Sequence, residues 1–155
     1  HYLGAMIRAH LAGRDVAISD ESALLLETGG GLRKAQPLLG GGPVLTLNSD
    51  AVWTGANPLL TLVGAWPVGA EALLLLVPRD AAVGHTGRGD FAMDAEGRLT
   101  RGGPLVYTGA QMLRTEELSA MSETVFSLNR LWDDAALRGG LRGVIHPGGW
   151  CDVGR

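Results

Sequence analysis

Hydrophobic and polar positions along the chain follow two periods, and each period predicts a different kind of element. Between residues 2 and 11, and again between 126 and 137, apolar side chains recur every three or four positions, which predicts amphipathic helices. Residues 71–77 are almost continuously apolar, which is typical of a strand buried on both faces. The same patterns predict helices at 32–39, 57–66 and 115–118, and strands at 15–19, 43–48, 89–93, 105–112, 141–146 and 150–153.

The order of these elements predicts the fold class. Strands alternate with helices, which favours a Rossmann-like α/β fold with a mixed, mostly parallel sheet flanked by helices. The length of 155 residues suits a single domain over residues 1–155, and the 46% share of hydrophobic residues supplies its core. Ligands of such sheets bind beyond the carboxyl ends of the strands, so the residues that follow each strand are the first candidates for chemistry.

Charge and composition narrow the chemistry. A net charge of −3 argues against a nucleic-acid-binding protein, which usually carries a basic face. The one cysteine, Cys151, excludes a disulfide framework and a cysteine-rich zinc site. The most apolar run, residues 72–77, is far too short to span a membrane. Chemistry must therefore come from carboxylates, hydroxyls and backbone amides and, where a metal takes part, from a hard metal ion.

A glycine-rich segment is the first candidate site. Glycine, with 24 residues, is about twice as frequent as in an average protein, and Gly29, Gly30 and Gly31 follow Glu27 and Thr28 just before a predicted helix. The first N–H groups of a helix have no partner within it, and glycine leaves them open to a base, a ribose or a phosphate. A tight strand-to-helix turn without a ligand explains the same residues.

Two aspartates, Asp50 and Asp152, are the candidates for a metal site. Asp50 follows the predicted strand 43–48, where a carboxylate is well placed to hold Mg²⁺ but is also a common turn residue. Asp152 lies within an apolar, strand-like run, where a carboxylate must be paired, hydrogen-bonded or bound to a metal. Two aspartates from separate strands that meet at one ion satisfy both requirements.

Two further segments suit contact with a sugar or a phosphate. Gly89 and Asp90 stand within the sequence Gly-Arg-Gly-Asp-Phe at 87–91, and an integrin-type interpretation of that motif has no support in a chain without a disulfide framework. Thr108 and Gly109 lie in the middle of a predicted strand, where glycine indicates a bulge or the close approach of a ligand.

Taken in order along the chain, these segments resemble the sugar-1-phosphate nucleotidyltransferase family. The likeness is closest to its bacterial MurNAc-1-phosphate uridylyltransferase-like and mannose-1-phosphate guanylyltransferase-like members, and it covers nearly the whole chain. No single motif decides the resemblance, which rests on the ordered set of segments at 27–31, 47–53, 87–91, 107–109 and 150–154.

The resemblance implies site residues and a reaction. Asp50 and Asp152 would be the catalytic ligands of Mg²⁺. An oxygen of a sugar-1-phosphate would attack the α-phosphorus of an NTP, either UTP or GTP, and release pyrophosphate in the cytoplasm, with no membrane or nucleic acid as partner. The implied nucleotide-binding residues are Glu27, Thr28, Gly29, Gly30 and Gly31, and the implied substrate-binding residues are Asn48, Gly89, Asp90, Thr108 and Gly109.

The chain departs from the family pattern in three respects. The family's N-terminal glycine-rich loop, with its arginine and following lysine, belongs to a βαβ unit expected before His1 and does not occur in the sequence. Ser49 stands where the Asn-x-Asp motif usually has glycine. No Glu-Lys-Pro sugar-binding segment lies between Phe91 and Tyr107, which leaves the sugar open.

Two alternatives to an active enzyme stay open at this point. One is a catalytically inactive nucleotide or sugar sensor on the same fold, because a fold does not fix a function. The other is an unrelated α/β structural domain whose glycines are only turns, in which Asp50 and Asp152 would lie far apart.

Overall fold

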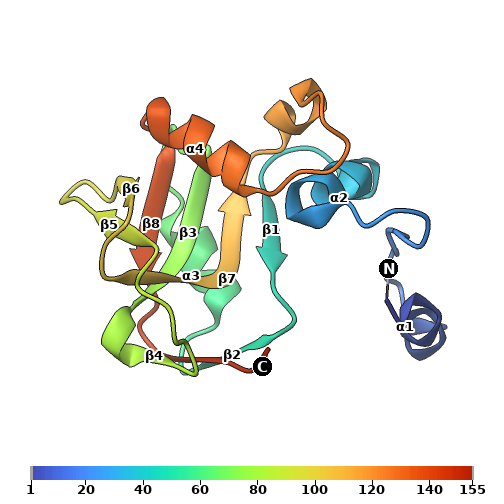
Figure 1. Ribbon diagram of the computed structural model, residues 1–155, viewed down its shortest axis with the longest axis horizontal. Helices are drawn as coiled ribbons and strands as arrows, with labels where there is room; N and C mark the ends of the chain where they lie inside the picture. Colours follow the sequence, from blue (N-terminus) through green and yellow to red (C-terminus); the bar gives the residue numbers. More distant parts are fainter. Residues whose placement is uncertain (1, 155) are drawn as a thin grey trace. The chain divides into compact units, whose positions relative to one another are not determined.

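The computed structural model describes residues 2–154, so His1 and Arg155 lie outside the described residues. The chain divides into two compact units (Figure 1). One unit contains the residues up to Gly42 and the segment Thr115–Leu131, and the other contains Pro43–Arg114 and the residues from Trp132 onward. The single domain over residues 1–155 stays a prediction.

The first unit is helical in its described residues. Its helices are α1 (Gly4–Leu11), α2 (Glu27–Ala35), the short 3₁₀ helices η1 (Gln36–Leu38) and η3 (Glu116–Ala120), and the start of α4 (Asn129–Leu137). The predicted helix at 2–11 is confirmed as α1. The predicted strand at 15–19 is wrong, because these mostly exposed residues have no strand to pair with among the described residues of this unit.

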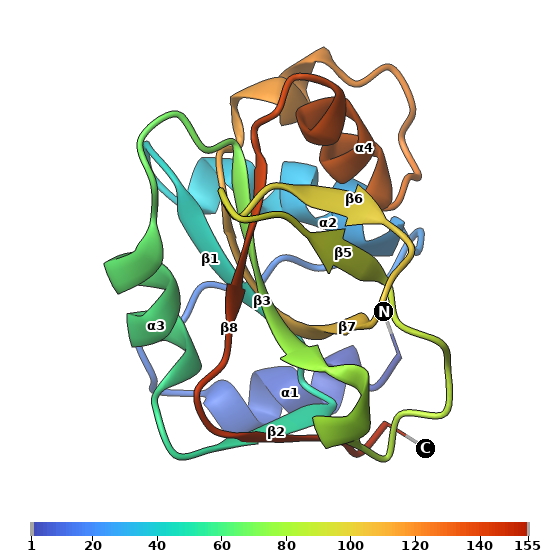
Figure 2. The same ribbon diagram turned by 90° about the vertical axis from the view of Figure 1, so that its left-hand side faces the viewer.

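The second unit is built on two sheets (Figures 1 and 2). Its strands are β1 (Val44–Leu47), β2 (Ala51–Thr54), β3 (Ala72–Pro78), β4 (Ala82–Val83), β5 (Phe91–Met93), β6 (Leu99–Arg101), β7 (Leu105–Leu113), β8 (Leu141–Ile145) and β9 (Gly149–Asp152). The six-stranded sheet has the order β6-β5-β7-β3-β8 with β1 paired to β7, and the three-stranded sheet has the order β2-β9-β4. Two helical segments, α3 (Pro58–Ala65) and the 3₁₀ helix η2 (Arg79–Ala81), connect strands of this unit.

The mixed α/β sheet predicted from the alternating elements is confirmed, with one correction to its strand directions. Strands β3 and β8 are parallel neighbours, and β1, β3 and β8 all run in the same direction. Strand β7, however, pairs with both β1 and β3 in the antiparallel sense, and the β5–β6 hairpin adds further antiparallel pairs. Most neighbouring pairs in the sheet are therefore antiparallel. Strand β7 lies between β1 and β3, which run in one direction, and itself runs opposite to both.

Helix α3 begins where the sequence predicts a helix. The side-chain oxygen of Asn57 accepts the backbone N–H groups of Leu59 at 2.9 Å and Leu60 at 3.2 Å, and Pro58 occupies the first helical position. These contacts satisfy two of the N–H groups that a helix start leaves without partners. Leu62, which is fully buried, fixes the helix on the sheet through a core cluster with Leu73, Leu75 and Ala110.

Strand β3 is buried along its length, as its continuous apolar sequence predicts. Residues 72–77 are at most 3% exposed, and burial of each leucine side chain stabilises the fold by about 1.5–3 kcal/mol. Trp132, in the part of α4 that belongs to this unit, stacks edge-on against Phe91 and Tyr107 and donates its indole N–H to Gln111 Oε1 at 2.8 Å. Helix and sheet are thus joined by both apolar packing and a buried hydrogen bond.

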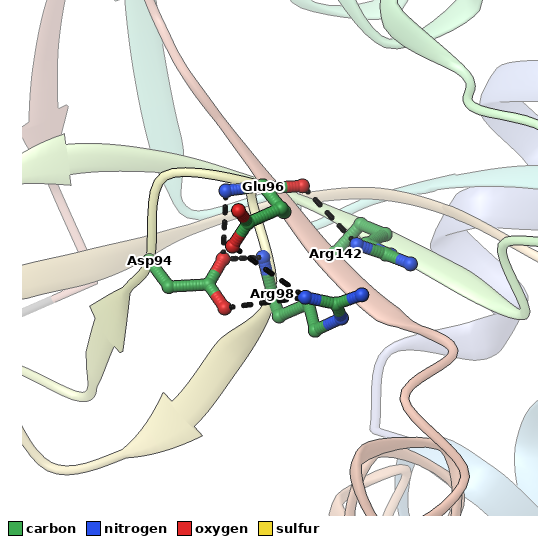
Figure 3. A network of polar contacts seen from close by, with 4 residues as sticks. All are labelled: Asp94, Glu96, Arg98 and Arg142. Carbon is green, nitrogen blue, oxygen red and sulfur yellow. Dashed lines mark hydrogen bonds and ion pairs between the residues drawn. The ribbon is translucent and has the colours of Figure 1, made fainter.

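The turn between β5 and β6 is closed by a carboxylate and fixed to β8 (Figure 3). Asp94 Oδ1 accepts the backbone N–H groups of Glu96 at 3.0 Å and Arg98 at 2.8 Å. The Arg142 guanidinium, on β8, donates to the Glu96 carbonyl at 3.1 Å. The bond from the Arg98 backbone N–H is the main reason that the pKa of Asp94 lies below its ordinary value.

Candidate active site

An open pocket in the second unit gathers most of the substrate- and metal-binding residues predicted from the sequence. The predicted residues Asn48, Asp50, Thr108, Gly109 and Asp152 all lie on its wall. The full lining consists of Asn48, Asp50, Ala51, His85, Tyr107, Thr108, Gly109, Trp150 and Asp152.

The pairing of β2 with β9 brings the two aspartates to this pocket. Asp50 immediately precedes β2 and Asp152 ends β9, and the two strands run antiparallel with Ala51 opposite Asp152. The backbone N–H of Val153 donates to the Asp50 carbonyl at 2.9 Å, which closes the ladder at the pocket. Figure 2 shows β2 beside the red strand that leads to the C-terminus. The alternative in which the two aspartates lie far apart is therefore excluded.

A bulge in β7 forms a further part of the pocket wall. The β3–β7 register shifts between Leu74 and Leu76, and Gly109 adopts a φ of +84°, a left-handed conformation that glycine tolerates best. A Cβ on Gly109 would lie 2.8 Å from the Cβ of Asn48, so glycine is required for Asn48 to sit beside the strand. The Thr108 hydroxyl donates to the Leu75 carbonyl at 2.9 Å. The bulge predicted as one of two explanations for Gly109 is thus present.

Trp150 fixes the bulge to the strand that carries Asp152. Its indole N–H donates to the Thr108 carbonyl at 2.9 Å, and its side chain is 6% exposed. Because Trp150 and Asp152 are two positions apart on β9, their side chains point to the same face. Both therefore face the pocket from one strand.

The lining of the pocket is acidic. Asp50 and Asp152 are its carboxylates, and His85 is the one lining residue that can carry a positive charge. The backbone N–H of Gly154 donates to Asp152 Oδ1 at 3.0 Å. No group of three or more histidine, cysteine, aspartate or glutamate side chains that could hold a metal occurs in the described part of the chain. A pair of carboxylates does fit Mg²⁺, which commonly takes one or two protein carboxylates and completes its shell with water and phosphate oxygens.

The sequence patterns do not identify His85 as a site residue; only its surroundings in the folded protein do so. The residue lies in a glycine-rich loop and belongs to no metal-binding spacing. In the structure its ring centroid lies 6.5 Å from that of Trp150, and its Nε2 lies 3.1 Å from the Arg88 carbonyl. A Cβ on Gly87 would approach Nε2 to 2.8 Å, so glycine at 87 lets the loop wrap around the ring.

Gly89 and Asp90, predicted to contact substrate, do not line the pocket but support its wall. Asp90 Oδ2 accepts the backbone N–H of Tyr107 at 2.8 Å, and its own N–H donates to the Leu105 carbonyl at 2.6 Å. Gly89 packs so closely on the Gly103 carbonyl that a Cβ could not be accommodated without movement. Tyr107 lines the pocket, and burial raises the pKa of its phenol above its ordinary value.

The glycine-rich segment differs from its predicted conformation. Gly29, Gly30 and Gly31 lie inside α2 rather than before it. The backbone N–H groups of Gly29 and Gly30 both donate to the Phe126 carbonyl, at 2.9 and 3.1 Å, so they are not open to a ligand here. Gly29 and Gly30 are buried, and a Cβ on Gly29 would overlap the Phe126 ring. The close packing of α2 against Thr124 and Phe126 is therefore the first reason for glycine at positions 29 and 30.

Glu27 and Thr28 also have structural roles within the first unit. Glu27 begins α2 with a φ of +60°, which is uncommon for a residue with a side chain. The Thr28 hydroxyl accepts the backbone N–H of Leu128 at 3.0 Å. The implied nucleotide-binding residues thus all belong to the first unit, and their contact with a nucleotide stays a prediction.

Comparison with known proteins identifies the family. The N-acetylmuramate alpha-1-phosphate uridylyltransferase of Caulobacter vibrioides is 35% identical over 169 aligned residues, which cover 99% of this chain and 70% of that protein. The chain belongs to the sugar-1-phosphate nucleotidyltransferase family. The Neisseria meningitidis protein of the same name is 33% identical over 155 residues, covering 92% of this chain and 63% of that protein. No protein-family model matches the chain.

Solved structures agree with the fold of this nucleotidyltransferase. HddC from Yersinia pseudotuberculosis, complexed with GMP-PN, superposes with a TM-score of 0.72 at 13% identity, covering 99% of this chain and 70% of that one. A putative glucose-1-phosphate thymidylyltransferase from Bacillus anthracis, in complex with a sucrose, gives a TM-score of 0.67 at 12% identity, covering 97% and 67%. At these identities the likeness shows the fold alone, and it confirms the predicted nucleotide-diphospho-sugar transferase type.

The nucleotidyltransferase has no helix, among the residues the structure describes, with the length and apolar character needed to cross a bilayer.

Proposed function

We propose that the protein transfers UMP from UTP to N-acetylmuramate α-1-phosphate, with release of pyrophosphate, in a Mg²⁺-dependent reaction in the cytoplasm. One observation carries the proposal: Asp50 and Asp152, about a hundred positions apart in sequence, are brought to one pocket by the pairing of β2 with β9. The names of the two curated relatives support the uridylyl group and the acceptor. The sensor alternative loses weight because the family is one of enzymes.

Asp50 and Asp152 are proposed to hold the ion with one carboxylate each. When bound there, Mg²⁺ would neutralise the negative charge that develops on the phosphates during transfer. Asp152 ends β9, and Asp50, directly before β2, is tied to the same ladder by the backbone hydrogen bond from Val153, so backbone pairing sets how the two carboxylates lie. Such preorganisation matters because nucleotidyl transfer depends mainly on alignment and charge stabilisation.

His85 is proposed to bind the phosphate of the acceptor. An acidic pocket repels a sugar phosphate, and His85 is the lining residue that can offer a positive charge, with an N–H donor at Nδ1 in its charged form. Its Nε2 is directed at the Arg88 carbonyl, which fixes the ring and leaves Nδ1 as the atom available for a ligand. The side chain of Asn48 and the backbone of the Thr108–Gly109 bulge supply further hydrogen-bonding groups on the same wall.

The proposal is tested by pyrophosphate release from the full-length protein. UTP and GTP are each supplied with N-acetylmuramate α-1-phosphate, N-acetylglucosamine 1-phosphate or mannose 1-phosphate, with and without Mg²⁺. Mg²⁺-dependent turnover with UTP and N-acetylmuramate α-1-phosphate, and with no other pair of substrates, supports the proposal. Turnover with GTP and mannose 1-phosphate would overturn the substrate assignment, and calorimetric binding of UTP without any turnover would favour the sensor.

A further inference from the structure

His146 is a buried polar residue that the proposed reaction does not use. It follows β8 directly, is 3% exposed, and its backbone N–H donates to the Leu76 carbonyl at 2.8 Å. Its ring atom Nε2 lies 3.3 Å from the Thr54 carbonyl. The other ring nitrogen, Nδ1, is buried with no hydrogen-bond partner.

The two ring nitrogens of His146 have different hydrogen-bonding roles. A carbonyl oxygen can only accept, so Nε2 carries the proton and donates to Thr54, which leaves Nδ1 as the unpaired acceptor. An unpaired buried acceptor is unfavourable, and an apolar residue would fill the same space without that disadvantage. The presence of histidine therefore points to the Nε2 contact as the feature that matters.

The Nε2 contact lies at the far end of the ladder that carries the two aspartates. Thr54 is opposite Gly149 at one end of the β2–β9 pair, and Ala51 is opposite Asp152 at the other. A Cβ on Gly149 would lie 2.6 Å from Thr54 Oγ1, and a Cβ on Gly148 would overlap the Thr54 carbonyl. The turn from His146 to β9 thus packs directly against the end of β2.

We propose that His146 is a positioning residue for the metal site. Its Nε2–H bond to Thr54 fixes the register of β2 on β9 and thereby sets Asp50 and Asp152 against each other at the pocket. Slippage of β2 by one residue would place another residue opposite Asp152 and move Asp50, directly before β2, relative to Asp152, so register decides whether both carboxylates reach the pocket. This inference rests on the proposed function, because the register matters to the reaction through the two metal ligands.

Two amide substitutions separate the ring nitrogens. His146→Gln places an amide nitrogen near the position of Nε2, whereas His146→Asn places it near the position of Nδ1. Both keep a polar side chain of similar character, so a general loss of packing or polarity affects them alike. Mn²⁺ binding to the full-length protein, followed by the signal of the free ion in electron paramagnetic resonance, reports the site without catalysis. Asp152→Asn is the control for the metal ligands, and Leu141→Val, a buried position at the start of β8, is the control for a weakened core.

His146→Asn is expected to weaken Mn²⁺ binding about tenfold, as is typical when an outer support of a metal site is removed. His146→Gln and Leu141→Val are expected to bind Mn²⁺ as the unaltered protein does. Equal affinity in the Asn and Gln variants, whether both normal or both weakened, overturns the role of His146. If Asp152→Asn itself binds Mn²⁺ normally, the metal assignment is wrong and the inference fails with it; loss in Asp152→Asn but not in His146→Asn overturns the inference alone.

Discussion

At the scale of single residues, the pocket combines two carboxylates with one histidine. Asp50 and Asp152 are placed by backbone pairing, whereas His85 is held by a ring contact with Trp150 and by the Arg88 carbonyl. The carboxylates and the histidine therefore depend on different parts of the chain and can be tested separately.

Replacement of Asp152 by asparagine is expected to lower kcat by about a hundredfold or more, because metal-derived charge stabilisation is worth several kcal/mol in the transition state. Asp50→Asn should act in the same direction. Asp80→Asn, at an exposed position in η2, is the matched control and should leave turnover unchanged. Steady-state pyrophosphate release measures all three, and normal turnover in Asp152→Asn contradicts the metal assignment.

Replacement of His85 by glutamine keeps an amide nitrogen near Nε2, which contacts the Arg88 carbonyl, but removes the donor at Nδ1. It is expected to raise KM for the sugar phosphate about tenfold, since a charged hydrogen bond contributes about 1.5–3 kcal/mol. KM for the nucleotide should stay constant. His10→Gln, on the exposed helix α1, is the control. A parallel rise of both KM values in His85→Gln would show that the residue shapes the pocket as a whole instead of binding the acceptor.

At the scale of elements, local patterns in the sequence predict individual helices and strands, whereas the pairing of strands does not follow from them. The helices at 2–11 and 57–66 and the strand at 71–77 follow from periodicity and an asparagine cap, which are local signals. Strand β2 was not predicted, because it directly follows a polar Asn-Ser-Asp run and becomes a strand only through its partner β9. The family resemblance indicates that the two aspartates lie together. Local patterns do not, because the register between strands that are distant in sequence leaves no local signal.

The glycine-rich segment shows the limit of the same reasoning. Three successive glycines favour a turn, yet Gly29 and Gly30 are inside a helix because Phe126 packs where their side chains would be. Tertiary contact of this kind overrides local propensity, and it cannot be deduced from composition.

Gly109→Ala is expected to destabilise the fold and to reduce activity. An alanine at φ +84° is strained by about 1–2 kcal/mol, and its Cβ would also lie 2.8 Å from the Cβ of Asn48 at the pocket. Gly69→Ala separates the two effects, because Gly69 has a similar φ of +79° with open space around it. Urea unfolding and turnover should show a shared loss of stability in both variants and lost turnover in Gly109→Ala only. Equal turnover in the two variants would show that Asn48 tolerates the displacement.

Asp94→Asn is expected to destabilise the second unit at neutral pH but not in acid. The folded pKa of Asp94 is lowered from its ordinary value of 3.8, chiefly by the Arg98 backbone N–H, so the ionised carboxylate stabilises the fold. That contribution is complete above pH 3.8 and is lost as the pH falls through the lowered folded pKa. Urea midpoints of the two proteins should therefore differ at neutral pH and converge in acid, with the exposed Asp80→Asn as control. A gap that persists undiminished in acid contradicts the role of the ionised carboxylate.

At the scale of the whole molecule, nucleotide and metal are expected to stabilise the folded protein together. A ligand present at about a hundred times its Kd adds about 2.7 kcal/mol to the free energy of unfolding. UTP with Mg²⁺ should therefore raise the Tm of the full-length protein, and UTP with a chelator should raise it less. The same shift in Asp152→Asn would show that the nucleotide binds without the proposed metal ligands.

The β2–β9 ladder also has a consequence for the order in which the protein is made. Residue 50 leaves the ribosome long before residue 152, so the earlier aspartate has no counterpart while the intervening strands are being synthesised. A nascent chain halted ahead of residue 149 contains the large sheet and most of the pocket wall but half of the acidic pair. The paired carboxylates thus form only after β9 has been synthesised, about a hundred residues later than Asp50, and has docked on β2.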